Sequence, residues 1–183
     1  MHVHNTKYLL EKKGNQIYQG LLEAKKEGLI DKIGVSIYTI KELNKIIEKI
    51  DIDLVLIPFN IFDQRTLKNN YLKKLKSKDI EIHARSVFLQ GLLNMPNNSI
   101  PKKFKIYKKY FRNWENLVKK HKLKKHEACL KYVLSNKYID MAIVGIDNSS
   151  HLRSLIKAVG YLNIPLKSVD ASNEIKLINP SKW

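Results

Sequence analysis

Polar residues close or directly follow five short apolar runs in this chain, and a helix-patterned segment follows each run. These residues are His4, Ser36, Asn60, Ser86 and Asp147. A hydroxyl both donates and accepts hydrogen bonds, and a neutral imidazole does one with each ring nitrogen. In a (β/α) barrel all such strand ends open onto one face, where ligands bind and chemistry is done. The first run begins at residue 1, so we expect the front of such a barrel to be missing.

The elements that must position these residues alternate along the chain. The segment before Ser36 is apolar on both faces, as is typical of a strand in a parallel sheet. Thr39 can cap the helix that follows, and Glu42 three residues later completes a capping box. The expected strands are residues 31–37, 53–59, 80–86 and 139–144, and the other expected helices are residues 16–27, 70–77, 102–121, 125–135 and 149–159.

The spacing of these elements predicts one α/β domain over residues 1–183. Ser36, Asn60 and Ser86 follow one another at intervals of about 25 residues, close to one step of a βαβ unit of roughly 30 residues. A doubly wound sheet is the competing architecture, but its glycine-rich first turn, G-x-G-x-x-G, is absent. Residues 160–183 have no clear period and are expected to form a tail.

The chain is strongly basic, with 34 Lys and Arg residues against 17 Asp and Glu and a net charge of +17. Such a balance raises nucleic acid or an anionic membrane as partners. We favour a compositional bias, because the lysines follow helical solvent faces along most of the chain. The densest basic patch, residues 102–125, carries large apolar residues at the spacing of a helix core stripe. These are Tyr107, Tyr110, Phe111, Trp114, Leu117 and Val118.

The single cysteine, Cys129, lies in an apolar helical segment and is expected to be a buried small hydrophobe. No disulfide can form within the chain, which fits a reducing compartment. The first residues do not have the pattern of a signal peptide, and no apolar run is long enough to cross a bilayer. We therefore expect a cytoplasmic protein without a metal site. The last helix, residues 149–159, is expected to turn Leu152, Leu155 and Ile156 inward.

Four segments, taken together, resemble the aldo-keto reductase family. Their order and spacing match the parts of that barrel around its fifth to eighth strands. The segments are LEAKKEGLIDKIGVS (22–36), PFNIFDQR (58–65), ARSVFLQGLL (84–93) and IVGIDN (143–148). The resemblance extends from His4 to Val159 and implies a partial TIM (β/α)8 barrel, from the end of strand 4 through strand 8 and its helix. It also implies binding of a nicotinamide dinucleotide and reduction of aldehydes or ketones.

By this resemblance, His4 is the catalytic residue that hydrogen-bonds the carbonyl of the substrate and helps to orient the proton donor. An ordinary terminal histidine is the alternative, and His2 is the alternative register. Ser36 is implied to face the nicotinamide carboxamide, a role compatible with a turn-forming serine. The family often has Asn and Gln where this chain has Ile37 and Leu56, so two carboxamide contacts are missing.

The resemblance also implies two phosphate-binding segments. Arg85, Ser86, Leu89 and Gly91 correspond to the loop that wraps the pyrophosphate. Such a loop offers backbone N–H donors and a hydroxyl, and glycine allows close approach. A simple turn glycine is the alternative for Gly91.

Gly145 and Asn148 precede the N-terminus of a helix, which favours anions. His151 is placed against the adenosine part of the cofactor. Asp147 stands near the place where the family often keeps a cation, so NADP, with NAD as the alternative, is inferred from the family alone. Asn60 is expected to tie down its own loop.

The other catalytic residues of the family are an Asp, a proton-donating Tyr and a Lys on the first three strands. Residues 1–15 do not supply them, and Tyr8, Tyr18 and Tyr38 lack the strand context. We therefore expect a truncated oxidoreductase that is inactive alone. The alternatives are a non-catalytic remnant or binding module with a partial dinucleotide site and, second, a basic nucleic-acid-binding domain. Unpaired strands at the His4 and Ile143 ends predict self-association.

Overall fold

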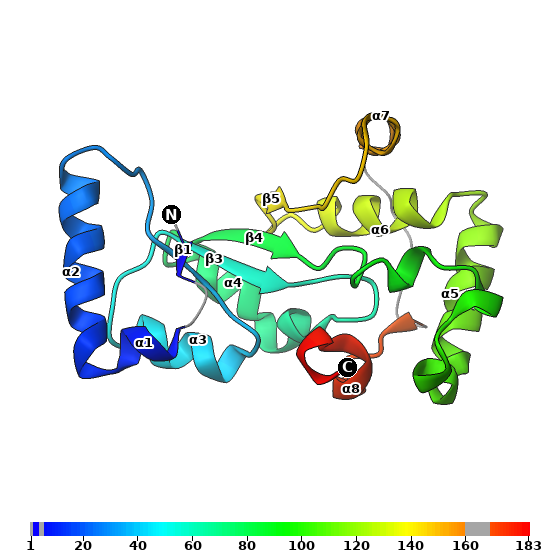
Figure 1. The fold of residues 1–183 in the computed structure, drawn as a ribbon, viewed down its shortest axis with the longest axis horizontal. Coiled ribbons are helices and arrows are strands. Elements are labelled where there is room, and N and C mark those ends of the chain that lie inside the picture. Colours follow the sequence, from blue (N-terminus) through cyan, green and yellow to red (C-terminus); the bar gives the residue numbers. More distant parts are fainter. Residues whose placement is uncertain (1, 4–5, 160–168) are drawn as a thin grey trace.

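The computed structural model describes residues 2–3, 6–159 and 169–183. Five strands alternate with helices along the chain (Figure 1). The strands are β1 (His2–Val3), β2 (Gly34–Ser36), β3 (Leu54–Pro58), β4 (Glu81–Arg85) and β5 (Met141–Ala142). The helices are α1 (Lys7–Leu10), α2 (Lys12–Lys26), α3 (Ile40–Ile47), α4 (Tyr71–Lys76), α5 (Lys108–Lys120), α6 (Lys125–Leu134), α7 (Ser149–Ala158) and α8 (Ile175–Ile178). Short 3-10 helices include η1 (Arg65–Asn70), η2 (Leu92–Asn94), η3 (Asn97–Ser99), η4 (Lys102–Tyr107) and η6 (Pro180–Lys182).

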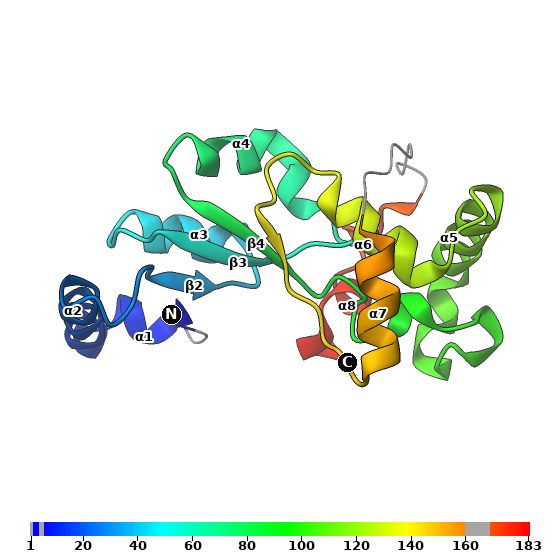
Figure 2. The same cartoon turned by 90° about the horizontal axis from the view of Figure 1, so that it is seen from above.

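All the described strands pair in parallel, and their order in the sheet is the order of the chain. A doubly wound sheet reverses its strand order at a switch point. The sheet described here has no such reversal, so each crossover advances in one direction, as in a barrel wall. Figure 2 shows α2 and α5 at opposite ends of the molecule, with the sheet between them.

The two faces of the sheet differ in how well they are covered. One face carries Val35, Val55 and Ile82 in one register row, and each is fully buried. The opposite face carries Ser36, Leu56, His83 and Met141 in the next row, of which Met141 is 47% exposed. We call this second face, with Arg85 one pleat further along β4, the open face. Parallel sheets are normally covered on both sides.

The predicted helix cap at Thr39 is confirmed in part. The Thr39 side chain accepts a hydrogen bond from the Glu42 amide at 3.1 Å. Glu42, however, does not return a bond to the Thr39 amide; it accepts from the Tyr38 amide at 2.9 Å and from the Thr6 hydroxyl. The capping box is therefore wrong by one residue, because α1 brings Thr6 beside α3.

The predicted core stripe in the basic patch is confirmed. Phe111, Trp114 and Val118 of α5 are buried, and the Trp114 indole donates to the Leu93 carbonyl at 2.9 Å. Cys129 of α6 is also fully buried, and burial raises the pKa of its thiol far above the usual range. The patch thus has a core-packing inner side.

Two predictions about the last helical unit are wrong. The final strand extends over Met141–Ala142 alone, well short of residues 139–144. In α7, Leu155 is buried as expected, but Leu152 is 40% exposed and Ile156 is 61% exposed. Helical spacing identified an apolar surface on α7, but the residues that the structure describes cover only its Leu155 side.

Candidate functional site

The predicted contact residue of β2, Ser36, lies at the end of its strand on the open face. It is 1% exposed, and its hydroxyl has no hydrogen-bond partner among the described residues. Leaving a buried polar group unpaired costs about 1–3 kcal/mol. The hydroxyl is therefore available to a partner that the described chain does not supply.

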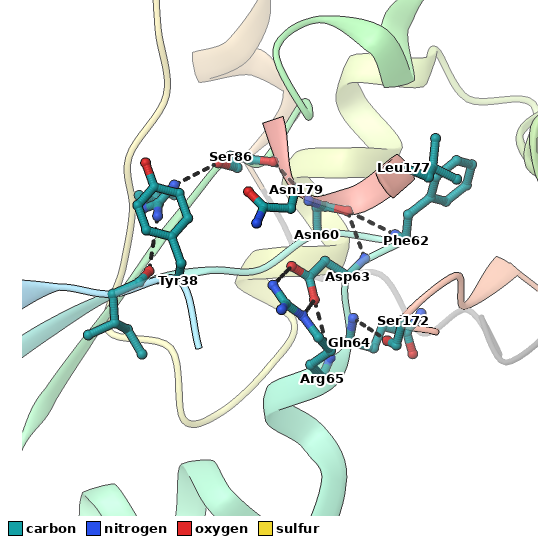
Figure 3. Close-up of polar contacts among 12 residues, drawn as sticks. Tyr38, Asn60, Phe62, Asp63, Gln64, Arg65, Ser86, Ser172, Leu177 and Asn179 are labelled. Atoms are coloured by element: carbon teal, nitrogen blue, oxygen red, sulfur yellow. Dashed lines mark hydrogen bonds and ion pairs between the residues drawn. The ribbon is translucent and has the colours of Figure 1, made fainter. Parts of the chain in front are cut away.

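Arg85 lies at the end of β4, and its guanidinium crosses the open face to β2. One terminal nitrogen donates to the Ile37 carbonyl at 3.0 Å, and the other donates to the Ser86 hydroxyl at 3.2 Å (Figure 3). The guanidinium carbon stands 4.5 Å from the centre of the Tyr38 ring. Burial lowers the pKa of Arg85, but a guanidinium stays charged at any ordinary pH. Tyr38 follows β2 by two residues and lies outside the strand, in agreement with the prediction that it lacks strand context.

The loop that follows β4 has an unusual backbone. Ser86, Leu89, Gln90 and Gly91 all have positive φ, at 59°, 47°, 54° and 80°. Left-handed backbone costs a residue other than glycine roughly 1–2 kcal/mol. Strain of this kind concentrates at ligand-binding sites, and such turns aim successive N–H groups into an anion-binding concavity. The side chain of Leu89 is fully buried, and its amide already donates to the Ser86 carbonyl at 2.9 Å, so Leu89 shapes the loop from within and does not offer a donor to a ligand.

Asn60, in the loop after β3, ties down its own loop as predicted. Its side-chain oxygen accepts from the amides of Phe62 and Asp63 at 2.9 Å each. Its side-chain nitrogen also donates to the Ser86 carbonyl at 3.0 Å, which fixes the start of the β4 loop (Figure 3). Asn60 therefore positions two neighbouring strand-end loops.

A buried ion pair holds the same loop. Arg65 donates to both carboxylate oxygens of Asp63 at 2.7 Å. Burial raises the pKa of Asp63, and the adjacent guanidinium opposes that shift. Because both Asp63 oxygens accept from Arg65, this bidentate pair stabilises the loop.

The described end of the tail, residues 169–183, reaches this region, which the sequence did not predict. Ser172 accepts from the Gln64 amide at 2.9 Å (Figure 3). The Ala171 amide donates to the Phe62 carbonyl at 2.9 Å. Val169 and Leu177 are fully buried. The tail lacks a sequence period because it packs by isolated residues in a short segment.

A cavity of about 540 Å³ separates the β4 loop from the β5 end. It brings together Arg85, Ser86, Gly91, Gly145 and His151, all predicted as cofactor contacts. The other lining residues are Val87, Phe88, Gln90, Asn94, Ile143, Val144 and Asp147. The side-chain oxygen of Asn94 is buried without a partner among the described residues. Ser36, Leu89 and Asn148 do not line this cavity.

The start of α7 forms one wall of the cavity. The Asn148 side chain accepts from the His151 amide at 2.8 Å and so caps the helix. The Asp147 carboxylate, 92% exposed, stands 3.8 Å from the His151 ring. Because the Asn148 side-chain oxygen caps the helix, it is already used within the chain. Asp147 adds negative charge to the rim of the cavity, as the sequence suggested.

Three further expectations concern His4, a metal site and a membrane-spanning helix. His4 lies outside the described residues, so its predicted catalytic role keeps its status as a prediction. Among residues 2–3, 6–159 and 169–183, no three side chains of His, Cys, Asp or Glu gather as metal ligands. In the same ranges, no helix is both long and apolar enough to span a bilayer.

Known proteins resemble this chain in sequence and in fold. The family model described as "Aldo/keto reductase family" matches residues 4–176. The match therefore extends beyond Val159 into the tail. A search of curated proteins found no match.

Solved structures share the fold. The glycerol dehydrogenase AKR11B4 from Gluconobacter oxydans superposes with a TM-score of 0.68 at 17% identity, over 98% of this chain and 58% of its own. The holo form of the aldo-keto reductase AKR11C1 from Bacillus halodurans superposes with a TM-score of 0.71 at 13% sequence identity. This likeness covers 100% of this chain and 61% of AKR11C1. The thermostable aldo-keto reductase Tm1743, in complex with epalrestat, superposes with a TM-score of 0.60 at 22% sequence identity. This likeness covers 84% of this chain and 53% of Tm1743. The chain thus spans between about half and two thirds of these proteins.

Proposed function

The chain belongs to the aldo/keto reductase family, and on that premise we propose that it binds a nicotinamide dinucleotide across the strand ends of its sheet. In the proposed reaction the bound cofactor supplies a hydride to an aldehyde or ketone. The chain spans less than two thirds of the solved relatives, so the complete reaction is proposed only for a full barrel to which these strands would contribute.

The observation that carries this proposal is the left-handed loop from Ser86 to Gly91 beside the 540 Å³ cavity. Its backbone N–H groups suit the oxygens of a pyrophosphate. Ser36 supplies a buried hydroxyl without a partner among the described residues, which suits an amide group. Both features have the chemistry that a dinucleotide requires, and they lie at the ends of β2 and β4.

The residues of this chain would divide the work between them. Ser36 would orient the carboxamide, and backbone N–H groups of the Ser86–Gly91 loop other than that of Leu89 would donate to phosphate oxygens. Gly145 and His151, which line the cavity at the start of α7, would receive the adenosine end. His4 is proposed to hydrogen-bond the carbonyl oxygen. A side chain that donates the proton is not identified among the described residues, so the chain is proposed to lack turnover alone.

Two finer points belong to the same proposal. We favour NADP over NAD on the family likeness, although Asp147 places a negative charge at the rim. We also propose a cytoplasmic location, because the single cysteine, Cys129, is buried and free.

The test combines binding with turnover. NADPH is titrated into the chain by calorimetry, and NADPH consumption is then followed with a generic aldehyde. Saturable binding without consumption is the expected result and also describes a binding module. Consumption of NADPH would contradict the proposed lack of turnover. Salt-sensitive binding of duplex DNA with no NADPH binding would instead favour the nucleic-acid alternative, since phosphate contacts release counterions.

A further inference from the structure

Arg85 is held rigidly on the open face of the sheet. Its two terminal nitrogens are fixed by the Ile37 carbonyl and the Ser86 hydroxyl, and the Tyr38 ring lies against its plane. These contacts come from the ends of two different strands, β2 and β4. A guanidinium fixed in this way loses little freedom on binding a further partner, so it is preorganised.

The guanidinium of Arg85 is half-buried, and Asp63 and Glu42 act on its charge without forming an ion pair with it. No Asp or Glu among the described residues forms an ion pair with Arg85, and its Nε is buried without a hydrogen-bond partner. Buried charges are normally paired, because an isolated charge is costly in a low-dielectric environment. The absence of a counter-ion therefore calls for an anion from outside the described residues.

The two carboxylates that act electrostatically on Arg85, those of Asp63 and Glu42, already have other hydrogen-bond partners. Asp63 is held by both donors of Arg65. Glu42 accepts from the Tyr38 amide and from the Thr6 hydroxyl. Both carboxylates act on Arg85 through their charge, yet neither is free to turn toward it.

We infer that Arg85 is a specificity-determining residue that binds the carboxylate of an acidic carbonyl substrate. The inference rests on the proposed function, because it assigns the substrate class of the same site. A planar guanidinium matches a carboxylate better than it matches a neutral group. The preferred substrates are then aldehydes or ketones that carry a carboxylate.

The phosphate groups of the cofactor are the other source of an anion. The position of Arg85 favours the substrate. Its guanidinium turns from β4 toward Ile37 and Tyr38 at the β2 end, on the same sheet face as Ser36. The left-handed N–H groups proposed for phosphate begin only at Ser86. Arg85 lines the 540 Å³ cavity beside Ser86, and its bond to the Ile37 carbonyl, one residue past Ser36, directs its guanidinium toward the β2 end of that cavity.

The test compares two ligands of matched shape, 4-carboxybenzaldehyde and its neutral amide, 4-carbamoylbenzaldehyde. Their affinities for the full chain are measured by ligand-observed NMR, with and without NADPH, and NADPH affinity is measured separately. We expect the carboxylate to bind at least about tenfold more tightly, as a charge-assisted hydrogen bond implies. Arg85→Met should abolish this preference, and because Arg85 also donates to the Ser86 hydroxyl, NADPH affinity should fall by less than the carboxylate affinity does.

Two further variants control for folding and for bulk charge. Arg85→Lys keeps the charge without the planar group and should retain a reduced preference. Arg112→Gln removes an exposed arginine of α5 and should change neither affinity. Circular dichroism checks that each variant is folded.

The outcomes separate this inference from the proposed function. Equal binding of the two ligands to the unaltered chain overturns the role of Arg85. Loss of NADPH affinity in Arg85→Met, with the carboxylate preference intact, assigns the guanidinium to the cofactor and also overturns it, while the proposed function stands. A carboxylate preference without any NADPH binding would contradict the proposed function instead.

Discussion

At the scale of single residues, three of the buried polar atoms without a partner among the described residues belong to the site, on Ser36, Arg85 and Asn94; the others are on Thr66 and Tyr132. The Ser36 hydroxyl and the Arg85 Nε are both buried without partners, and both belong to strands that end at the same edge. Most buried polar atoms in proteins are paired, so two orphans at one edge indicate a ligand rather than poor packing.

Ser36→Ala tests the orphan hydroxyl. Removing an unpaired buried hydroxyl should raise the free energy of unfolding of the ligand-free chain by about 1 kcal/mol. The same change should weaken NADPH binding, since the proposed carboxamide contact is lost. Urea unfolding and calorimetry measure the two effects. A loss of stability in the ligand-free variant would mean that the hydroxyl has a partner within the chain.

The Glu81 carboxylate gives a pH dependence. It accepts from the His83 ring at 2.8 Å and pairs with Lys32, and these contacts lower the pKa of Glu81 from 4.5 to about 2. Because the unfolded chain binds the proton more readily, this contribution to stability is present above about pH 4.5 and is lost as pH falls toward 2.

Glu81→Gln should therefore show a smaller fall in unfolding free energy between pH 4.5 and pH 2 than the unaltered chain. Urea titrations at several pH values make the comparison, with the exposed Glu23→Gln as the control. Parallel curves for Glu81→Gln and the unaltered chain would contradict the assignment.

At the scale of elements, the β4 loop is the clearest functional feature. Four of its positions adopt left-handed backbone, and Asn60 holds the loop at the Ser86 carbonyl. Glycine occupies only one of these positions, Gly91, so the strain at the other three is supported by the surrounding packing.

Gly91→Ala measures that backbone requirement. A Cβ at Gly91 would meet no atom within 4 Å, so any cost arises from its φ of +80°. The change should lower the free energy of unfolding by about 1–2 kcal/mol. Gly20→Ala, also without close neighbours but inside α2, should raise it by about 0.5–1 kcal/mol. Chemical denaturation compares them; equal effects at the two sites would contradict this account.

Sequence patterns predicted these elements where the cause is local. The Thr39 cap and the stripe of Phe111 and Trp114 follow from spacing along one helix. The left-handed backbone at Leu89 carries no local signal, because it is imposed by packing. The Ser172 contact with the Gln64 amide joins segments far apart in the chain, so no short pattern could have predicted it.

At the scale of the whole molecule, the sheet is parallel, ordered along the chain and less covered on its open face. Met141 and Ile143, near its β5 edge, are 47% and 43% exposed. Exposed apolar residues beside a short edge strand favour association. We therefore predict that the isolated chain forms dimers or larger species in sedimentation velocity. A stable monomer at all concentrations tested would contradict this prediction.

The central claim is that these strand ends bind a nicotinamide dinucleotide, and the most direct test is a calorimetric titration of NADPH into the chain. We predict saturable binding at one site per chain, weakened in both Ser36→Ala and Gly91→Ala and unchanged in Arg112→Gln. Absence of saturable binding up to about 1 mM NADPH would contradict the claim, since the free energy of binding would then be no more favourable than about −4 kcal/mol.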